Sequence, residues 1–127
     1  MSIQQIMTAD ETGENLVKFA DETAEKLVRA SLTRAQIRNI FTEVRQIESL
    51  WGMNHTDALR RLNMLKPKLA YQTARTPQMK DLQSVLSEAI TLVSNAASDE
   101  EKGERFQRFM DLFEAILAYH RAKGGRN

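Results

Sequence analysis

The chain has 127 residues, of which 42% are hydrophobic and 28% charged, which excludes both global disorder and two full-sized domains. It contains no cysteine, so disulfides and thiolate metal sites are excluded, and its formal net charge is only +1. No apolar stretch approaches the roughly 18 residues that span a bilayer. We therefore expect no membrane contact and, with no secretion signal at the start of the sequence, a cytoplasmic protein.

The charge is unevenly distributed along the chain. Residues 1–30 carry three basic and six acidic side chains, a net charge of −3, and residues 31–80 carry nine basic and three acidic, a net charge of +6. Residues 81–127 carry six basic and eight acidic, a net charge of −2. A basic central segment between two acidic ones indicates a site for a polyanion, unless its cations are spread around a solvated surface.

Helical periodicity runs through the chain and predicts about five helices, without strands or internal repeats. The first helix covers about residues 12–30. The second begins at Thr33, which forms a capping box with Gln36, and it ends at Gly52. The apolar face of this second helix consists of Ile37, Ile40, Phe41, Val44, Ile47 and Trp51.

Two prolines mark the next boundaries. A third helix follows residues 54–56 and runs towards Leu65, and Pro67 then either kinks this helix or begins a new one. The following helix is expected to open with Thr76 as its cap and Pro77 as its first residue.

The last predicted helix begins at Ser98, where acidic residues 99–101 favour a helix N-terminus, and it ends before Gly124-Gly125. Its apolar face consists of Phe106, Phe109, Leu112, Phe113, Ile116, Leu117 and His120. The predicted fold is therefore all-α, a compact single-domain bundle of about five helices over residues 1–127. Residues of about 1–10 and 123–127 are expected to be loose.

Residues that are typical of catalysis are hard to find in this sequence. The two histidines, His55 and His120, form no zinc-binding motif, and no glycine-rich loop opens a helix as phosphate-binding loops do. The carboxylates of Glu48, Glu88 and Glu114 have no partner at a spacing that acid–base catalysis needs. We therefore expect no enzymatic activity, no cofactor and no bound metal.

Basic side chains form a stripe on the second predicted helix. Arg34, Arg38 and Arg45 fall within roughly 40° on a helical wheel, at the border of the apolar face. Packing of their stems against this face would reduce the entropy that is lost when they bind phosphate.

A second basic stripe lies in residues 62–75 and the turn before them. Arg61, Lys68 and Arg75 are spaced by seven residues and lie within roughly 40° on the wheel, and Lys66 is close by in sequence. The two helices together could present a continuous positive strip to a polyanion. Ion pairs with acidic residues such as Glu43 would instead neutralise it.

The aromatic residues fit a hydrophobic core better than a base-stacking platform, because four of them lie on apolar faces: Phe41, Phe106, Phe109 and Phe113. Tyr71 and Trp51 are the plausible exceptions, although we favour the core or an interface for both. Contact with a nucleic acid is therefore expected mainly at its backbone, with little sequence preference.

Three blocks of sequence occur in order over roughly residues 32–125. The first is Leu32-Thr33 with residues 36–40, the second is residues 65–71 with Arg75, and the third is Phe109 with residues 114–120 and Gly124-Gly125. These blocks resemble the small subunit of the type III-A CRISPR effector (Csm) complex.

This resemblance implies a small helical, non-catalytic protein that stacks in several copies along the guide RNA and the bound target RNA. Its other partners would be the other subunits of the complex. Arg38, Lys66, Lys68 and Arg75 lie in the matching blocks, so the resemblance makes them the best candidates for contacts with the RNA backbone. Arg34, Arg45 and Arg61 join them on wheel geometry alone.

Two other classes remain open. The basic helices could dock an acidic protein partner, whereas a small-molecule or metal-binding four-helix protein would need a histidine and glutamate pattern that is missing here. Stacking between copies needs apolar patches, which Trp51, Met53, Met64 and Met79 could supply near helix ends. Exchange of a helix between chains, hinged at Gly52 or at the Lys66-Pro67 break, could give a dimer in isolation.

Overall fold

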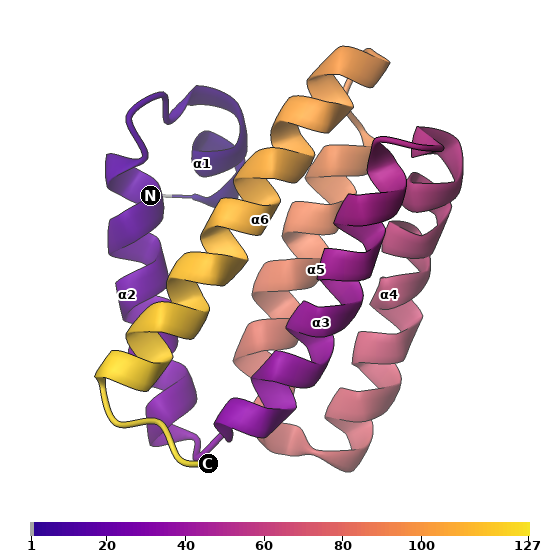
Figure 1. Ribbon diagram of the computed structural model, residues 1–127. Helices are drawn as coiled ribbons and strands as arrows, with labels where there is room; N and C mark the ends of the chain where they lie inside the picture. The colour runs from indigo at the N-terminus through magenta and orange to yellow at the C-terminus, as the bar shows by residue number, and fades with distance from the viewer. Residues whose placement is uncertain (1) are drawn as a thin grey trace.

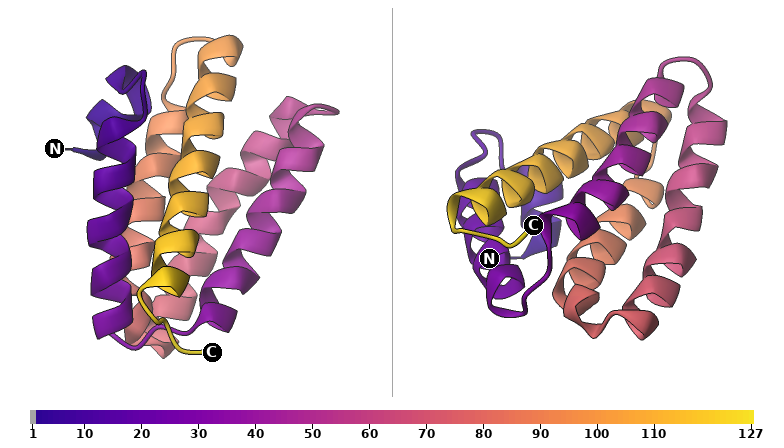
Figure 2. Two further views of the ribbon diagram at one scale, coloured as in Figure 1. Left: turned by 60° about the vertical axis from the view of Figure 1, so that its left-hand side comes forward. Right: turned by 60° about the horizontal axis from the view of Figure 1, so that its bottom comes forward.

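The computed structural model describes residues 2–127, which form six α-helices, one short 3-10 helix and no strand (Figures 1 and 2). The helices are α1 (Ile3–Ala9), α2 (Glu14–Arg29), α3 (Arg34–Trp51), α4 (His55–Arg75), α5 (Lys80–Ser94) and α6 (Asp99–Ala122), with the 3-10 helix η1 at Pro77–Met79. The predicted all-α bundle is confirmed, with six helices in place of about five. Within the described range, no helix has the length and hydropathy that a bilayer-spanning segment requires.

The helix α6 is the centre of the bundle and packs against α1, α2, α3 and α5, whereas α4 packs on the other side of α3 and α5 (Figure 1). Burial of large apolar side chains stabilises this position of α6, and each fully buried Leu, Ile, Phe or Met contributes about 1.5–3 kcal/mol to the free energy of folding. Its buried residues are Phe106, Phe109, Met110, Leu112, Phe113, Ile116 and His120. α2, α4 and α6 run in one direction and α3 and α5 in the other.

The predicted helix starts of α3 and α6 are confirmed by hydrogen bonds. The Thr33 hydroxyl accepts from the Gln36 N–H (3.1 Å), and the Gln36 side chain accepts from the Thr33 N–H (2.9 Å), which completes the capping box. The Ser98 hydroxyl accepts from the Glu101 N–H (3.1 Å). These caps satisfy backbone donors that the first helical turn leaves unpaired.

The sixth helix is one that the sequence analysis did not predict. The expectation of a loose segment over about residues 1–10 is wrong for α1, because Ile3, Ile6 and Met7 are buried in the core. A capping box between Ser2 and Gln5 starts this helix. A helix of seven residues is marginal by itself, so packing against α5 and α6 stabilises it.

The chain continues through Pro67 as one helix, α4, so a new helix does not begin there. A proline inside a helix costs about 3 kcal/mol or more. Burial of Leu62 and Leu65 before it and Leu69 after it holds both halves of α4 against the core and offsets this cost.

The next helix starts differently from the prediction. The Thr76 side chain accepts no capping hydrogen bond, and Pro77 opens the 3-10 helix η1, so α5 begins only at Lys80. Thr76 instead ends α4, where its N–H donates to the Gln72 carbonyl (2.7 Å).

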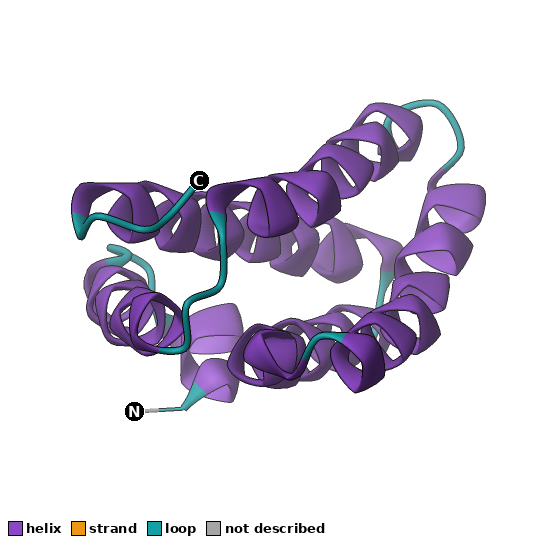
Figure 3. Ribbon diagram, turned by 90° about the horizontal axis from the view of Figure 1, so that it is seen from below, coloured by secondary structure: helices purple, strands orange, loops and turns teal. Residues whose placement is uncertain are grey.

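The segment after α6 is also held in place, which corrects the expectation that residues 123–127 are loose. Seen from below, it crosses from the end of α6 to the start of α3 (Figure 3). The Arg34 N–H donates to the Arg126 carbonyl (2.6 Å), and the Arg34 Nε donates to the Gly125 carbonyl (2.7 Å). The tail thus supplies acceptors to the N-terminus of α3.

Candidate nucleic-acid interface

The three arginines of α3 lie on the edge of that helix that faces α6. Arg34 and Arg38 line a cavity between the two helices, together with Glu114, Leu117, Ala118, His120, Arg121 and Ala122. Arg45 lies higher on the same edge, 5.0 Å from the Phe41 ring centre and 3.9 Å from the Glu114 carboxylate of α6.

Two cations of α4 lie on the opposite edge of α3. Arg61 Nη2 donates to Gln46 Oε1 of α3 (3.4 Å), and Lys68 Nζ lies 2.6 Å from Glu43 Oε1 of α3. The two stripes therefore do not merge into one continuous strip. They flank the outward ridge of α3, which is built of small, exposed, uncharged side chains at sevenfold spacing: Ala35, Thr42 and Ser49.

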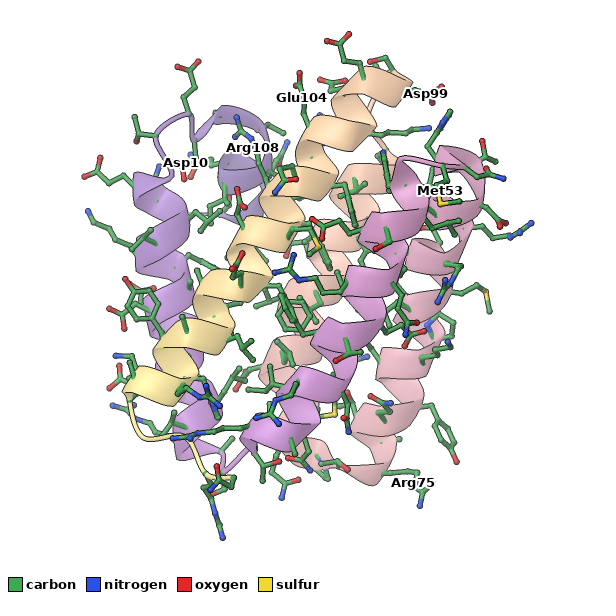
Figure 4. The ribbon with its side chains drawn as sticks, viewed as in Figure 1. Asp10, Met53, Arg75, Asp99, Glu104 and Arg108 are labelled. Atoms are coloured by element: carbon green, nitrogen blue, oxygen red, sulfur yellow. The ribbon has the colours of Figure 1, made fainter. Side chains whose placement is uncertain are left out.

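Arg75 lies at the lower end of α4, where its guanidinium is exposed (Figure 4). It packs 5.7 Å from the ring centre of Tyr71 and donates to the Tyr71 hydroxyl (3.3 Å). Tyr71 is 63% exposed, so this aromatic ring is available to a ligand. Trp51, in contrast, stacks on Phe106 with ring centres 4.4 Å apart and belongs to the core.

Lys66 is the predicted residue that the structure does not bring together with the others. Its ammonium donates to the Thr91 hydroxyl of α5 (2.6 Å), on the side of α4 away from α3. Two residues along a helix turn the side-chain direction by about 200°, so Lys66 and Lys68 point to opposite edges of α4.

Ion pairs neutralise part of the interface. Lys68 pairs with Glu43, and Arg45 pairs with Glu48 (2.9 Å). Exposed pairs of this kind contribute only about 0–1 kcal/mol, so phosphate can replace the carboxylate at little cost. Within residues 2–127, Arg38 makes no ion pair at all, and its side chain is exposed.

The structure also separates charge along the bundle axis, which the charge count by segment did not indicate. One end gathers the starts of α2, α4 and α6, and the labelled Asp10, Asp99 and Glu104 lie there together with one labelled basic residue, Arg108 (Figure 4). The other end gathers the ends of these helices with the start of α3. The basic residues near it are Lys26, Arg29, Arg34, Arg38, Arg75, Lys80, Arg121, Lys123 and Arg126.

The helix macrodipole explains most of this separation. Acidic side chains at a helix N-terminus and basic ones at its C-terminus are each stabilising by about 0.3–1 kcal/mol. α2, α4 and α6 follow this rule and run in the same direction. Their acidic first turns therefore lie at one end of the bundle and their basic last turns at the other. α3 departs from this rule, because it has no acid in its first turn and begins with Arg34. The Arg34 side chain instead secures the C-terminal segment, because its Nε donates to the Gly125 carbonyl (2.7 Å).

The two histidines lie at opposite ends of the bundle, with His55 at the start of α4 and His120 near the end of α6. His120 is fully buried, and its Nε2–H donates to the Leu32 carbonyl (2.8 Å). Among residues 2–127, no three His, Asp or Glu side chains come together in a group that could hold a metal ion.

Fold and site together define a class of protein, the small helical bundle whose distinctive features are its charged surfaces. Sequence comparison identifies the family. The family model described as Csm2 Type III-A matches residues 10–126, nearly the whole chain, and the chain belongs to this family. Searches of the curated proteins and of the solved structures found no significant match.

Membership in this family confirms the resemblance that the sequence blocks indicated. The family is a structural, non-catalytic subunit of the type III-A CRISPR effector complex. The chain is therefore a structural subunit that assembles with the other subunits of this complex.

Proposed function

We propose that this subunit binds the RNA backbone and stacks in several copies along the guide RNA and target RNA of the complex. The observation that carries the RNA contact is the set of cations on both edges of α3, above all Arg38, which is exposed and has no acidic partner in the range 2–127. The proposed contact residues are Arg34, Arg38, Arg45, Arg61, Lys66, Lys68 and Arg75. Lys66 is expected to contribute least, since Thr91 already binds its ammonium.

Each copy would bind weakly. Neutralising about three to five phosphates of single-stranded RNA gives a slope of log affinity against log salt of about −2 to −3.5. A single copy then releases RNA readily at physiological salt. Copies that stack on one guide raise the effective concentration of every further contact, so retention comes from the array.

The charge separation along the bundle axis supports a head-to-tail arrangement of these copies. The acidic end of one copy, with Asp10, Asp99 and Glu104, can face the basic end of the next. Met53, which is 84% exposed at the acidic end, would supply apolar contact area. Light scattering at low salt should then show association that grows with protein concentration, and an Asp99→Lys/Glu104→Lys variant should associate less. Equal association of the variant would contradict this arrangement.

The RNA contact is tested by fluorescence anisotropy of the purified chain with single-stranded RNA and with guide–target duplex RNA, at low and at physiological salt. Binding should be sequence-tolerant and sensitive to salt, and the Arg38→Glu/Lys68→Glu variant should lose it. Lys18→Glu/Arg29→Glu is the matched control, because it makes the same change in net charge at two exposed positions of α2, away from both edges of α3. A loss for only some RNA sequences, or an equal loss in the control, would contradict backbone recognition.

A second candidate function is the docking of an acidic protein partner. The ion pairs of Lys68 with Glu43 and of Arg45 with Glu48 favour it, because these cations already bind carboxylates within the chain. Absence of RNA binding even at low salt would shift the assignment to such a partner.

A further inference from the structure

A cavity of about 520 Å³ lies between the start of α3 and the end of α6. Higher on the interface, two aromatic pairs close the space between these helices. Trp51 stacks on Phe106, and Phe41 packs edge-on against Phe113 with ring centres 5.1 Å apart. Below these pairs, the interface stays open.

The opening has a simple cause in the sequence of α6. The side chains that line the cavity from this helix include Leu117, Ala118 and Ala122, which are smaller than the phenylalanines higher on α6. They give the cavity an apolar floor that is partly open to solvent. Its volume falls within the range of about 300–1,000 Å³ that is usual for small-ligand sites.

Arginines surround this apolar floor. Arg34 and Arg38 line the cavity from α3, and Arg121 lines it from α6. The bond from Arg34 Nε to the Gly125 carbonyl (2.7 Å) fixes the Arg34 guanidinium, whose terminal NH₂ groups make no hydrogen bond to residues 2–127. The acidic member of the lining is Glu114, and the three arginines of the same lining leave the cavity with a net positive charge.

We propose that this cavity receives one nucleobase of the bound RNA, turned out of its stack, while Arg34 and Arg38 bind the phosphates on either side of it. The inference rests on the proposed RNA-binding function and adds a ligand to the same surface. A base presents a flat apolar face to Leu117 and Ala118, and the planar guanidinium of Arg121, which lines the same cavity, can stack on the other face. A carboxylate by itself would pair with the arginines but would leave the apolar side chains of the cavity exposed to water.

The test compares two short RNA strands of equal length and charge, one natural and one in which every base is removed, by anisotropy at low salt. The natural strand should bind at least about fivefold more tightly, which is the lower end for one stacked base. Equal affinities would overturn the nucleobase site and leave backbone binding intact. Absence of binding by both strands would overturn both proposals for the isolated chain.

A cavity-filling variant assigns the difference to this site. Ala118→Leu adds volume at an exposed position of α6 without changing the charge, and Ala70→Leu makes the same change at an exposed position of α4. Ala118→Leu should reduce the preference for the natural strand and leave affinity for the base-free strand unchanged, whereas Ala70→Leu should change neither. An unchanged preference in Ala118→Leu would overturn the assignment of the nucleobase to this cavity. A competition experiment gives a second test: if an acidic peptide that contains aromatic residues displaces the bound RNA at a lower concentration than unlabelled RNA does, the assignment is also overturned.

Discussion

Replacement of Gly125 by alanine tests how the C-terminal segment is attached to the bundle. A Cβ atom at this position would collide with Cε1 and Nδ1 of His120 and would lie 2.6 Å from Nε2. The imidazole cannot give way easily, because it is fully buried and its Nε2 is bonded to the Leu32 carbonyl. The backbone of the tail must therefore move.

The expected cost follows from three hydrogen bonds. The Gly125 N–H donates to the His120 carbonyl (2.8 Å), and the two bonds from Arg34 reach the carbonyls of Gly125 and Arg126. Each is worth about 0.5–1.5 kcal/mol net, and water replaces part of them, so we expect a loss of about 1–2 kcal/mol in the free energy of unfolding. The corresponding fall in Tm is about 4–8 °C.

The assay is urea and thermal unfolding of Gly125→Ala beside Gly52→Ala. Position 52 is the matched control, since its φ of −71° is ordinary and a Cβ there meets nothing within 4 Å. The control should lose no stability. Hydrogen exchange of the Arg34 amide should accelerate in Gly125→Ala alone. Native stability together with native protection of Arg34 in that variant would refute the close approach of Gly125 to His120.

Three further predictions concern other parts of the fold. Ser31→Gly should stabilise the protein by about 1 kcal/mol in urea unfolding, because Ser31 has a φ of 66°, where a side chain is strained; a loss of stability would contradict this. Ile6→Ala should cost about 2–5 kcal/mol, since Ile6 is fully buried in α1, whereas the exposed Gln4→Ala should cost nothing; equal effects would mean that α1 does not pack on the core. The hydrogen bond to the Asp21 carboxylate (2.5 Å) raises the pKa of Lys123, so this contact stabilises the fold at neutral pH and is lost only as the pH rises through that pKa. An NMR titration should find a lower pKa for Lys123 in Asp21→Asn, and an unchanged pKa would argue against the pair.

The elements that the sequence predicted well are those whose signals are local. The capping box of Thr33 and Gln36 and the three-four spacing of apolar residues both depend on neighbours within one or two turns, and both are present in α3. The same kind of signal was available for α1, in the capping box of Ser2 and Gln5. It was missed because a helix this short exists only through its packing on distant helices.

The elements that the sequence predicted poorly depend on tertiary packing. The cost of Pro67 within the helix is outweighed by burial of the leucines on both sides of it. This burial depends on distant helices, so the sequence around Pro67 does not predict it. The neighbour that Lys68 or Lys66 faces depends on how α4 is rotated between α3 and α5. The charged ends of the bundle appear only when the helix directions are known, because Lys26 and Arg126 are remote from Arg38 in sequence.

The most direct test of RNA binding by the edges of α3 is the salt dependence of RNA affinity for the native chain and for Arg38→Ala. Log affinity against log salt should fall with a slope of about −2 to −3.5 for the native chain, and the variant should reduce the steepness by about 0.7, the contribution of one phosphate contact. A slope near zero, or an unchanged slope in Arg38→Ala, would contradict the account.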